Sequence, residues 1–232
     1  MALVTLLSMR ERAIRAADAE GTIDPALAAD KAYTDPIINS ALGRLHDLLT
    51  ESFEDYHLNV SSAVVVSGAA TTFTLTSASI TNLLKLRSLE RQRLDLKYDD
   101  VERISLGERN RRIERGYFIA QDTVHLYPSE KAVGTYRVWY TPGFSLLVAD
   151  TGPTGSYETI NGWEEIAVVD AARQFKADLE KDTSELQRRY DELRAHVMNV
   201  AKQRNAHGPR KVRKVRWTIY DQLLSSDIER LP

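Results

Sequence analysis

Two stretches, Thr135-Tyr-Arg-Val-Trp-Tyr-Thr-Pro142 and Ile160-Asn-Gly-Trp-Glu-Glu165, are the most informative about the fold of this chain. The first alternates polar and bulky apolar side chains, which is typical of a β-strand. In the second, Asn161 is the expected N-cap of a helix whose first turn holds Trp163 and two acidic residues. A segment rich in Gly, Asp and Thr separates them. The sequence therefore predicts a β region that is followed by a helical one.

Upstream, apolar residues at helical spacing predict two helices. The first covers roughly residues 4–19 and ends near Gly21, which is expected to act as its C-terminal cap. The second is expected to start at Thr34-Asp35-Pro36, with Thr34 or Asp35 as N-cap and Pro36 in the first turn. Its apolar residues then recur every three or four positions as far as Phe53, a stripe that is suited to a core.

Two further helices are predicted downstream. The helix that follows Asn161 has an apolar face led by Trp163. The segment Asp182-Thr-Ser-Glu185 has the pattern of a capping box, so we expect a break near Lys181 and a fourth helix over residues 183–203.

From about residue 58 to residue 142 the pattern changes to short alternating stretches that are typical of strands. Residues 62–67 and 72–76 are expected to form a hairpin, and residues 101–112 a short helix. The remaining predicted strands cover residues 84–89, 93–98, 116–120, 123–127 and 135–140.

These elements together predict an α+β fold: an antiparallel helical bundle core of about four helices, with an inserted small antiparallel β-sheet and an extended C-terminal arm. Trp139 and Trp163 are expected to be core or subunit-interface residues, and one place where they could pack is the contact between the sheet and the bundle. The expected divisions are N-terminal helices (1–57), an inserted β region (58–145), C-terminal helices (146–204) and a basic arm (205–232).

Composition excludes several kinds of site. The chain of 232 residues has no cysteine, which excludes disulfides, thiolate zinc sites and cysteine nucleophiles. The five histidines show no spacing that is typical of a metal site, and the loop Gly152-Pro-Thr-Gly-Ser156 lacks the lysine of a phosphate-binding loop. No nucleophile, base and orienting partner can be named, so an enzyme is the least favoured class of protein. No apolar run is long enough to predict a membrane span.

The charge is unevenly distributed. Residues 202–216 hold seven basic residues and no acidic one, which leaves 24 basic against 33 acidic residues elsewhere, a net charge of about −9. A basic arm on an acidic body is suited to binding something negative. The expected contact residues are Arg210, Lys211, Arg213, Lys214, Arg216, Trp217 and Tyr220. The residues alone leave open whether this arm binds protein or touches DNA. A second basic cluster, Arg109-Asn-Arg-Arg112 with Arg115, keeps a sequence-independent nucleic-acid-binding protein as the alternative.

The order of several short segments resembles the head-to-tail adaptor, or connector, proteins of tailed bacteriophages. The resemblance rests on Thr34-Asp-Pro with the following Asn39-Ser-Ala-Leu42, on Glu108-Arg-Asn-Arg111, on the strand at 135–142, on Asn161-Gly-Trp-Glu-Glu165 and on Val169-Asp-Ala-Ala172.

The resemblance implies a structural protein of the virion neck that is assembled in the host cytoplasm, is not an enzyme and needs no cofactor. Such proteins form rings, commonly of twelve copies, below the portal protein, and they carry the next neck or tail protein. Genomic DNA passes through the ring without specific binding. The resemblance further implies that the helical core forms the ring wall, that the sheet projects toward a neighbouring neck or tail protein, and that the C-terminal arm reaches the portal. The unusually basic arm with Trp217 departs from the simplest form of the family pattern.

Overall fold

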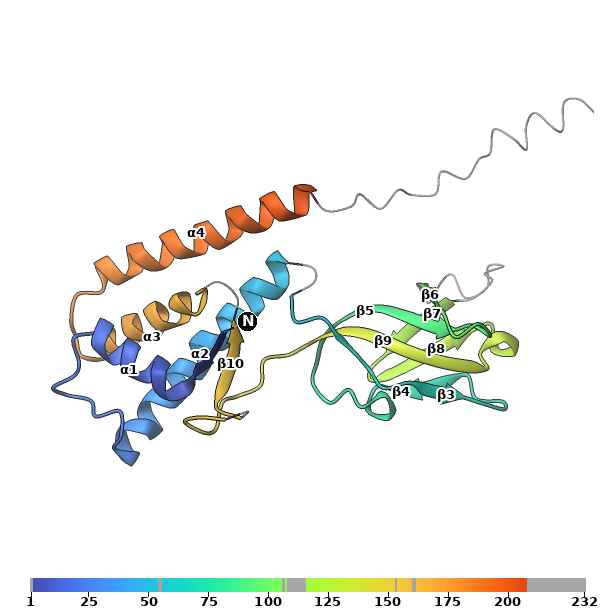
Figure 1. Ribbon diagram of the computed structural model, residues 1–232, viewed down its shortest axis with the longest axis horizontal. Helices are drawn as coiled ribbons and strands as arrows, with labels where there is room; N and C mark the ends of the chain where they lie inside the picture. The colour runs from blue at the N-terminus through green and yellow to red at the C-terminus, as the bar shows by residue number, and fades with distance from the viewer. Residues whose placement is uncertain are drawn as a thin grey trace, which may run out of the picture.

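The chain folds into a helical unit and a sheet unit that each have a core of their own (Figure 1). The computed structural model describes residues 2–53, 56–105, 107, 116–152, 154–159 and 162–207. The helical unit combines the two ends of the described chain, and the sheet unit lies between them in sequence.

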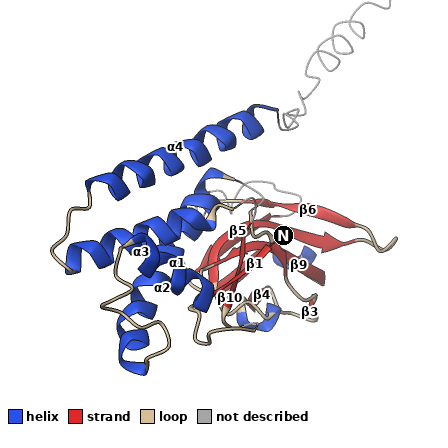
Figure 2. Cartoon of the chain, turned by 60° about the vertical axis from the view of Figure 1, so that its left-hand side comes forward, coloured by secondary structure: helices blue, strands red, loops and turns tan. Residues whose placement is uncertain are grey.

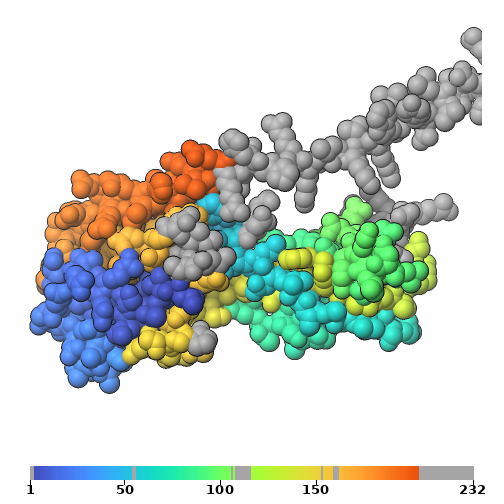
Figure 3. Space-filling model, viewed as in Figure 1, coloured from blue at the N-terminus to red at the C-terminus, as the bar shows by residue number. Residues whose placement is uncertain are grey.

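The helical unit consists of four helices and a two-stranded antiparallel ribbon. Its elements are β1 (Ala2–Thr5), α1 (Leu6–Ala16), α2 (Ala28–Ser52), β10 (Ser156–Thr159), α3 (Glu164–Asp178) and α4 (Ser184–His207). Helix α3 contacts the other three helices, so its apolar residues are buried on nearly every side. Figure 3 shows α4, in orange, lying along the surface of the unit.

The sheet unit is an eight-stranded mixed sheet. Its strands are β2 (Asn59–Val60), β3 (Val64–Val66), β4 (Thr72–Thr74), β5 (Leu83–Gln92), β6 (Tyr98–Arg103), β7 (Gly116–Ala120), β8 (Thr123–Tyr127) and β9 (Gly134–Pro142). Short 3-10 turns occupy Thr76–Ala78 and Ser129–Lys131. The strand order is β2-β9-β5-β6-β7-β8-β4, and β3 also pairs with β9. All pairs are antiparallel except β6–β7, which is parallel.

The sheet curls into a half-barrel, and its edge strands β3 and β4 come close to each other. Curling turns one face of each strand inward, and the inward side chains form the core of this unit. Leu89 on β5 and Val138 on β9 are paired in register, and both are completely buried.

The predicted helical bundle core with a small inserted sheet is therefore wrong. The sheet is large, mixed and curled, and it dominates the architecture instead of decorating a bundle. Alternation predicts most of these strands one at a time, but it does not reveal the long-range pairing that joins them into one large curled sheet.

Several strand details also differ from the prediction. The expected hairpin of residues 62–67 and 72–76 does not form, since β3 pairs with β9 and β4 with β8. Residues 93–97 form the turn between β5 and β6 rather than a strand, and Val101–Arg103 belong to β6 rather than to a helix. The strands predicted at 116–120, 123–127 and 135–140 are confirmed.

The N-terminal boundaries were predicted incorrectly. Residues 2–5 form a strand before α1, and α1 ends at Ala16, where Asp18 takes the left-handed conformation (φ 52°) that was expected of Gly21. Helix α2 begins at Ala28, so Asp35 and Pro36 lie inside the helix and not at its start. Pro36 lies beyond the first turn, so it removes a backbone hydrogen bond inside the helix, and packing of α2 in the helical core must offset this cost.

Asp35 has a different structural role. Its carboxylate accepts hydrogen bonds from the guanidinium of Arg10, whose side chain is completely buried (Nε–Oδ1 2.9 Å). Arg10 also donates to the Pro25 carbonyl (3.1 Å) and to Asp150 (2.9 Å), and Lys31 pairs with Asp150 at 2.6 Å. This network connects α1, α2 and the segment before β10.

The predicted break before the fourth helix is confirmed. Helix α3 ends at Asp178 and α4 starts at Ser184, whose backbone N–H donates to the Asp182 carboxylate at 3.0 Å. The predicted acidic first turn of α3 is also present, and Glu164 and Glu165 both pair with Arg12 of α1.

Candidate interaction site at the joint between the helices and the sheet

The chain crosses between the two units twice, and both crossings lie beside the C-terminal half of α2. One connection leads from α2 to β2, and the other from β9 to the segment before β10. At the second crossing Asn82 and Gly143 exchange hydrogen bonds (2.9 and 3.2 Å), and His46 Nε2 lies 3.0 Å from the Pro142 carbonyl.

A buried amide fixes the segment that follows. The Asn39 side chain on α2 donates to the Leu147 carbonyl at 3.0 Å and accepts from its N–H at 2.8 Å. One side chain therefore satisfies both backbone groups of Leu147. These two hydrogen bonds fix the segment of residues 143–148 against α2.

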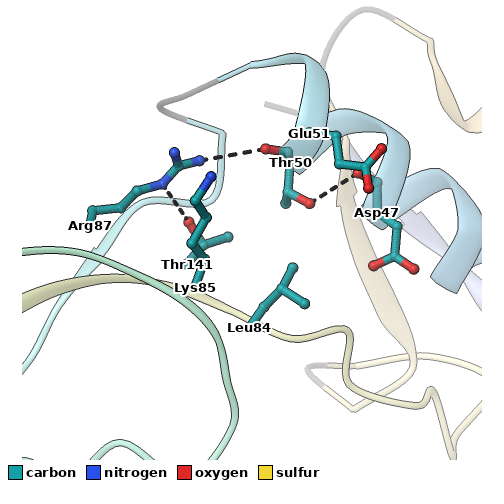
Figure 4. Close-up of a pocket in the computed structure, with 7 residues that line it drawn as sticks. All are labelled: Asp47, Thr50, Glu51, Leu84, Lys85, Arg87 and Thr141. Atoms are coloured by element: carbon teal, nitrogen blue, oxygen red, sulfur yellow. Dashed lines mark hydrogen bonds between the residues drawn. The ribbon is translucent and has the colours of Figure 1, made fainter. Parts of the chain in front are cut away.

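One side of the joint carries a charged cleft with a volume of about 270 Å³ (Figure 4). Arg87 of β5 donates to the Thr141 hydroxyl at 3.2 Å and to the Thr50 carbonyl of α2 at 3.5 Å. A cation placed at the last turn of a helix is favourable for the helix dipole. The cleft is lined by Asp47, Thr50, Glu51, Leu84, Lys85, Arg87 and Thr141. Its mixed charges are suited to polar contacts that orient a partner.

Another pocket at the joint has an aromatic floor and a volume of about 420 Å³; we call it the joint groove. His46 of α2 stacks on His57 with 5.0 Å between ring centroids, and Tyr56 meets His57 edge-on at 4.2 Å. Phe144 and Tyr157 pack around the same rings. The floor therefore joins residues from α2, both crossings and β10.

Burial favours the uncharged forms of three residues at the floor of the joint groove. Burial, together with a smaller contribution from the neighbouring His46, lowers the pKa of His57 to about 4. Burial raises the pKa of Tyr157 and of Tyr56, so both phenols stay protonated near neutral pH. Among the described residues, His46 Nδ1 and His57 Nε2 find no hydrogen-bond partner. Apolar side chains can therefore cover the His57, Tyr56 and Tyr157 rings without burying a charge.

The rim of the joint groove is apolar and exposed. Leu146 and Val148 line it with 68% and 77% of their surface exposed. Leu3 of β1, which is 70% exposed, pairs in register with Glu158 of β10, so the two side chains share a face of the ribbon. The exposed apolar side chains of Leu146 and Val148 at the mouth of a pocket are typical of a binding surface.

The structure separates the two tryptophans that were expected to pack at the sheet–bundle contact. Trp163 stacks on Phe53 at 5.0 Å and belongs to the helical core. Trp139 lies on β9, where the Arg137 guanidinium is 5.5 Å from its ring and 3.7 Å from the Tyr98 ring. The joint is made instead by histidines and tyrosines.

The predicted contact residues of the arm fall outside the described part of the chain, as does Asn161. The same applies to the basic cluster at Arg109–Arg112 and Arg115. Sequence reasoning missed the His46–His57 pair because the two residues lie eleven positions apart and meet only through the turn after α2, where His57 takes a left-handed conformation (φ 51°). The exposed Leu146 and Val148 gave a usable signal, since apolar residues in a loop between two units are unusual.

The described residues contain no group of three or more His, Asp or Glu side chains that could hold a metal ion. None of the described helices is long and apolar enough to cross a membrane. No model of a known protein family matches the chain, and no curated protein shows significant similarity to it.

Proposed function

We propose that this protein is a structural component of a phage particle: a ring-forming adaptor in the neck, which joins the portal protein to the tail and extends the DNA channel. Its partners would be the portal protein, neighbouring copies of the chain and a downstream neck or tail protein. The arrangement of α4 is the observation that carries the proposal.

Helix α4 has 24 residues, which corresponds to about 36 Å. Only a narrow stripe of it is buried, led by Leu186, Val197 and Ala201, while its charged face remains exposed. The helix starts at the turn after α3 and runs along the helical unit toward the side of the sheet unit (Figure 1). The described part of the chain therefore ends at His207, at the opposite end of α4 from the α3–α4 turn.

The two-unit build supports the same function. A subunit of a neck ring has to present different surfaces to its neighbours, to the portal and to the tail. Two units with separate cores provide these surfaces without exposing either core, and the joint groove and charged cleft provide local complementarity.

The proposal is tested by removing residues 209–232 and measuring co-purification with the portal protein encoded in the same genome. We expect the truncated chain to keep its helix and strand content by circular dichroism and to lose binding to the portal. A truncated chain that still binds the portal, or that unfolds, contradicts this role of the arm.

A DNA-binding titration over a range of salt concentrations distinguishes the adaptor from the alternative, a sequence-independent nucleic-acid-binding protein. A protein that works by neutralising phosphates binds duplex DNA with an affinity that falls steeply with salt. The adaptor is expected to bind DNA weakly at every salt concentration.

A further inference from the structure

The most exposed apolar side chains of the sheet unit lie at the turn between β5 and β6. Leu94 is fully exposed (106%) and Leu96 is 74% exposed. Figure 2 shows this hairpin projecting from the sheet, away from the helices. Exposure of two leucines to water at a projecting tip is unfavourable, and covering them with a partner lowers the free energy.

The tip has a defined shape. Arg93 N–H donates to the Lys97 carbonyl at 2.7 Å, and Leu96 N–H donates to the Arg93 carbonyl at 3.1 Å. Arg93 also pairs with Asp95 (3.5 Å) and Asp99 (3.6 Å) across the hairpin. Because the turn is closed by these bonds, little conformational entropy is lost when the tip docks.

The tip and the joint groove are complementary in apolar character and in charge. The groove offers the exposed apolar rim of Leu146 and Val148 over an aromatic floor. Exposed Lys97 flanks the tip and exposed Glu158 flanks the groove, and neither forms an ion pair with another described residue. Each surface thus has an apolar centre with one unpaired charge at its edge, and the two charges are opposite.

We propose that the β5–β6 tip of one copy inserts into the joint groove of the next copy, with Leu94 and Leu96 against Leu146 and Val148 and with Lys97 beside Glu158. This inference rests on the proposed ring-forming function and names the contact between neighbours. The tip and the groove are different surfaces of the same chain, so the contact is head-to-tail. A head-to-tail contact repeats around a closed ring when its rotation closes.

The absence of cysteine from the chain permits a direct test by crosslinking. A Leu94→Cys, Val148→Cys double variant, assembled with the portal protein and then oxidised, is expected to give a ladder of disulfide-linked oligomers in a denaturing gel. Each single variant is expected to give no ladder. The matched control is Leu94→Cys with Val65→Cys, since Val65 is also exposed (71%) but lies on β3, outside both surfaces.

A charge exchange tests the orientation of the contact. Lys97→Glu and Glu158→Lys are each expected to weaken assembly on the portal about tenfold, and the double variant is expected to restore it, since the pair is then reversed. Both positions are exposed, so folding should be unaffected, which circular dichroism checks.

The outcomes are distinguishable. If the unmodified chain forms rings but the double-cysteine variant gives no ladder and the charge exchange has no effect, the tip–groove contact is wrong and the adaptor function stands. If the unmodified chain does not assemble with the portal, the proposed function itself fails.

Discussion

Replacing Arg10 with methionine is expected to destabilise the helical unit and to loosen the segment that carries the groove rim. Methionine keeps much of the length of the side chain but removes the charge and all the hydrogen bonds to Asp35, Asp150 and the Pro25 carbonyl. Asp150 belongs to the same segment as Leu146 and Val148. Loss of its hydrogen bond with Arg10 is therefore expected to loosen the rim of the joint groove.

The magnitude follows from the burial of the partners. Arg10 is completely buried, whereas the side chains of Asp35 and Asp150 keep 28% and 35% of their surface exposed. Removing one partner of a buried ion pair costs about 3–5 kcal/mol. Because both carboxylates can regain water and Asp150 keeps Lys31, we expect the lower end, about 3 kcal/mol.

Urea unfolding followed by circular dichroism measures this loss. The matched control is Arg15→Met on the same helix, which removes an ion pair with Glu20 whose partners are 71% and 66% exposed. That change should cost less than about 1 kcal/mol. A loss below about 1 kcal/mol for Arg10→Met would mean that the network does not anchor the unit.

The hydrogen-bond network around Arg10 also predicts how the stability of the fold changes at acid pH. Hydrogen bonds from Lys31 and Arg10 lower the pKa of Asp150. Its stabilising contribution is therefore complete above the pKa of the unfolded chain and is lost as the pH falls through the lowered folded pKa. Unfolding of the Arg10→Met variant should show a weaker dependence on pH in this acid range than unfolding of the parent.

Two further predictions concern the joint and the sheet core. Since the pKa of His57 is lowered from 6.5 to about 4, the folded state should lose stability as the pH falls from about 6.5 to about 4; we expect a loss on the order of 1–2 kcal/mol after allowance for solvent screening. Asparagine tolerates the left-handed backbone at position 57, so His57→Asn should flatten this pH dependence in urea unfolding. His196→Asn, at an exposed position, should leave the dependence as it is. An unchanged profile for His57→Asn would refute the assignment of the pH dependence to His57. Leu89→Ala should destabilise the sheet unit by about 3 kcal/mol, because a completely buried side chain is removed, and Leu94→Ala at the exposed tip should change stability by less than about 0.5 kcal/mol; equal effects in thermal unfolding would contradict the core assignment.

Sequence reasoning predicted the helices well where local signals decide them. The break at Asp182–Ser184 depends on a carboxylate that accepts a neighbouring backbone N–H, and this contact is visible in the sequence. At Thr34-Asp35-Pro36 a similar capping pattern predicts a helix start, and this prediction is wrong. Asp35 binds the buried Arg10 instead of capping the helix, and the helix begins upstream at Ala28. A local capping pattern cannot reveal that such a partner is 25 residues away.

The sheet could be predicted only in part. Strands at 116–120, 123–127 and 135–140 follow from alternation, but their pairing does not. The parallel contact of β6 with β7 and the place of β3 and β4 at opposite edges depend on long-range packing. The joint groove could not be predicted either, since its floor joins residues from α2, the turn at Tyr56–His57 and β10. The exposed tip at Arg93–Lys97 could not be predicted, because the sequence pattern predicts a strand over this segment and a strand does not indicate an exposed turn.

Electron microscopy of the purified chain mixed with the portal protein of the same genome tests the central claim most directly. We expect closed rings of this chain seated on the portal, with the β5–β6 tip of each copy at the joint groove of the next. Single copies that bind duplex DNA and never associate with the portal would contradict it.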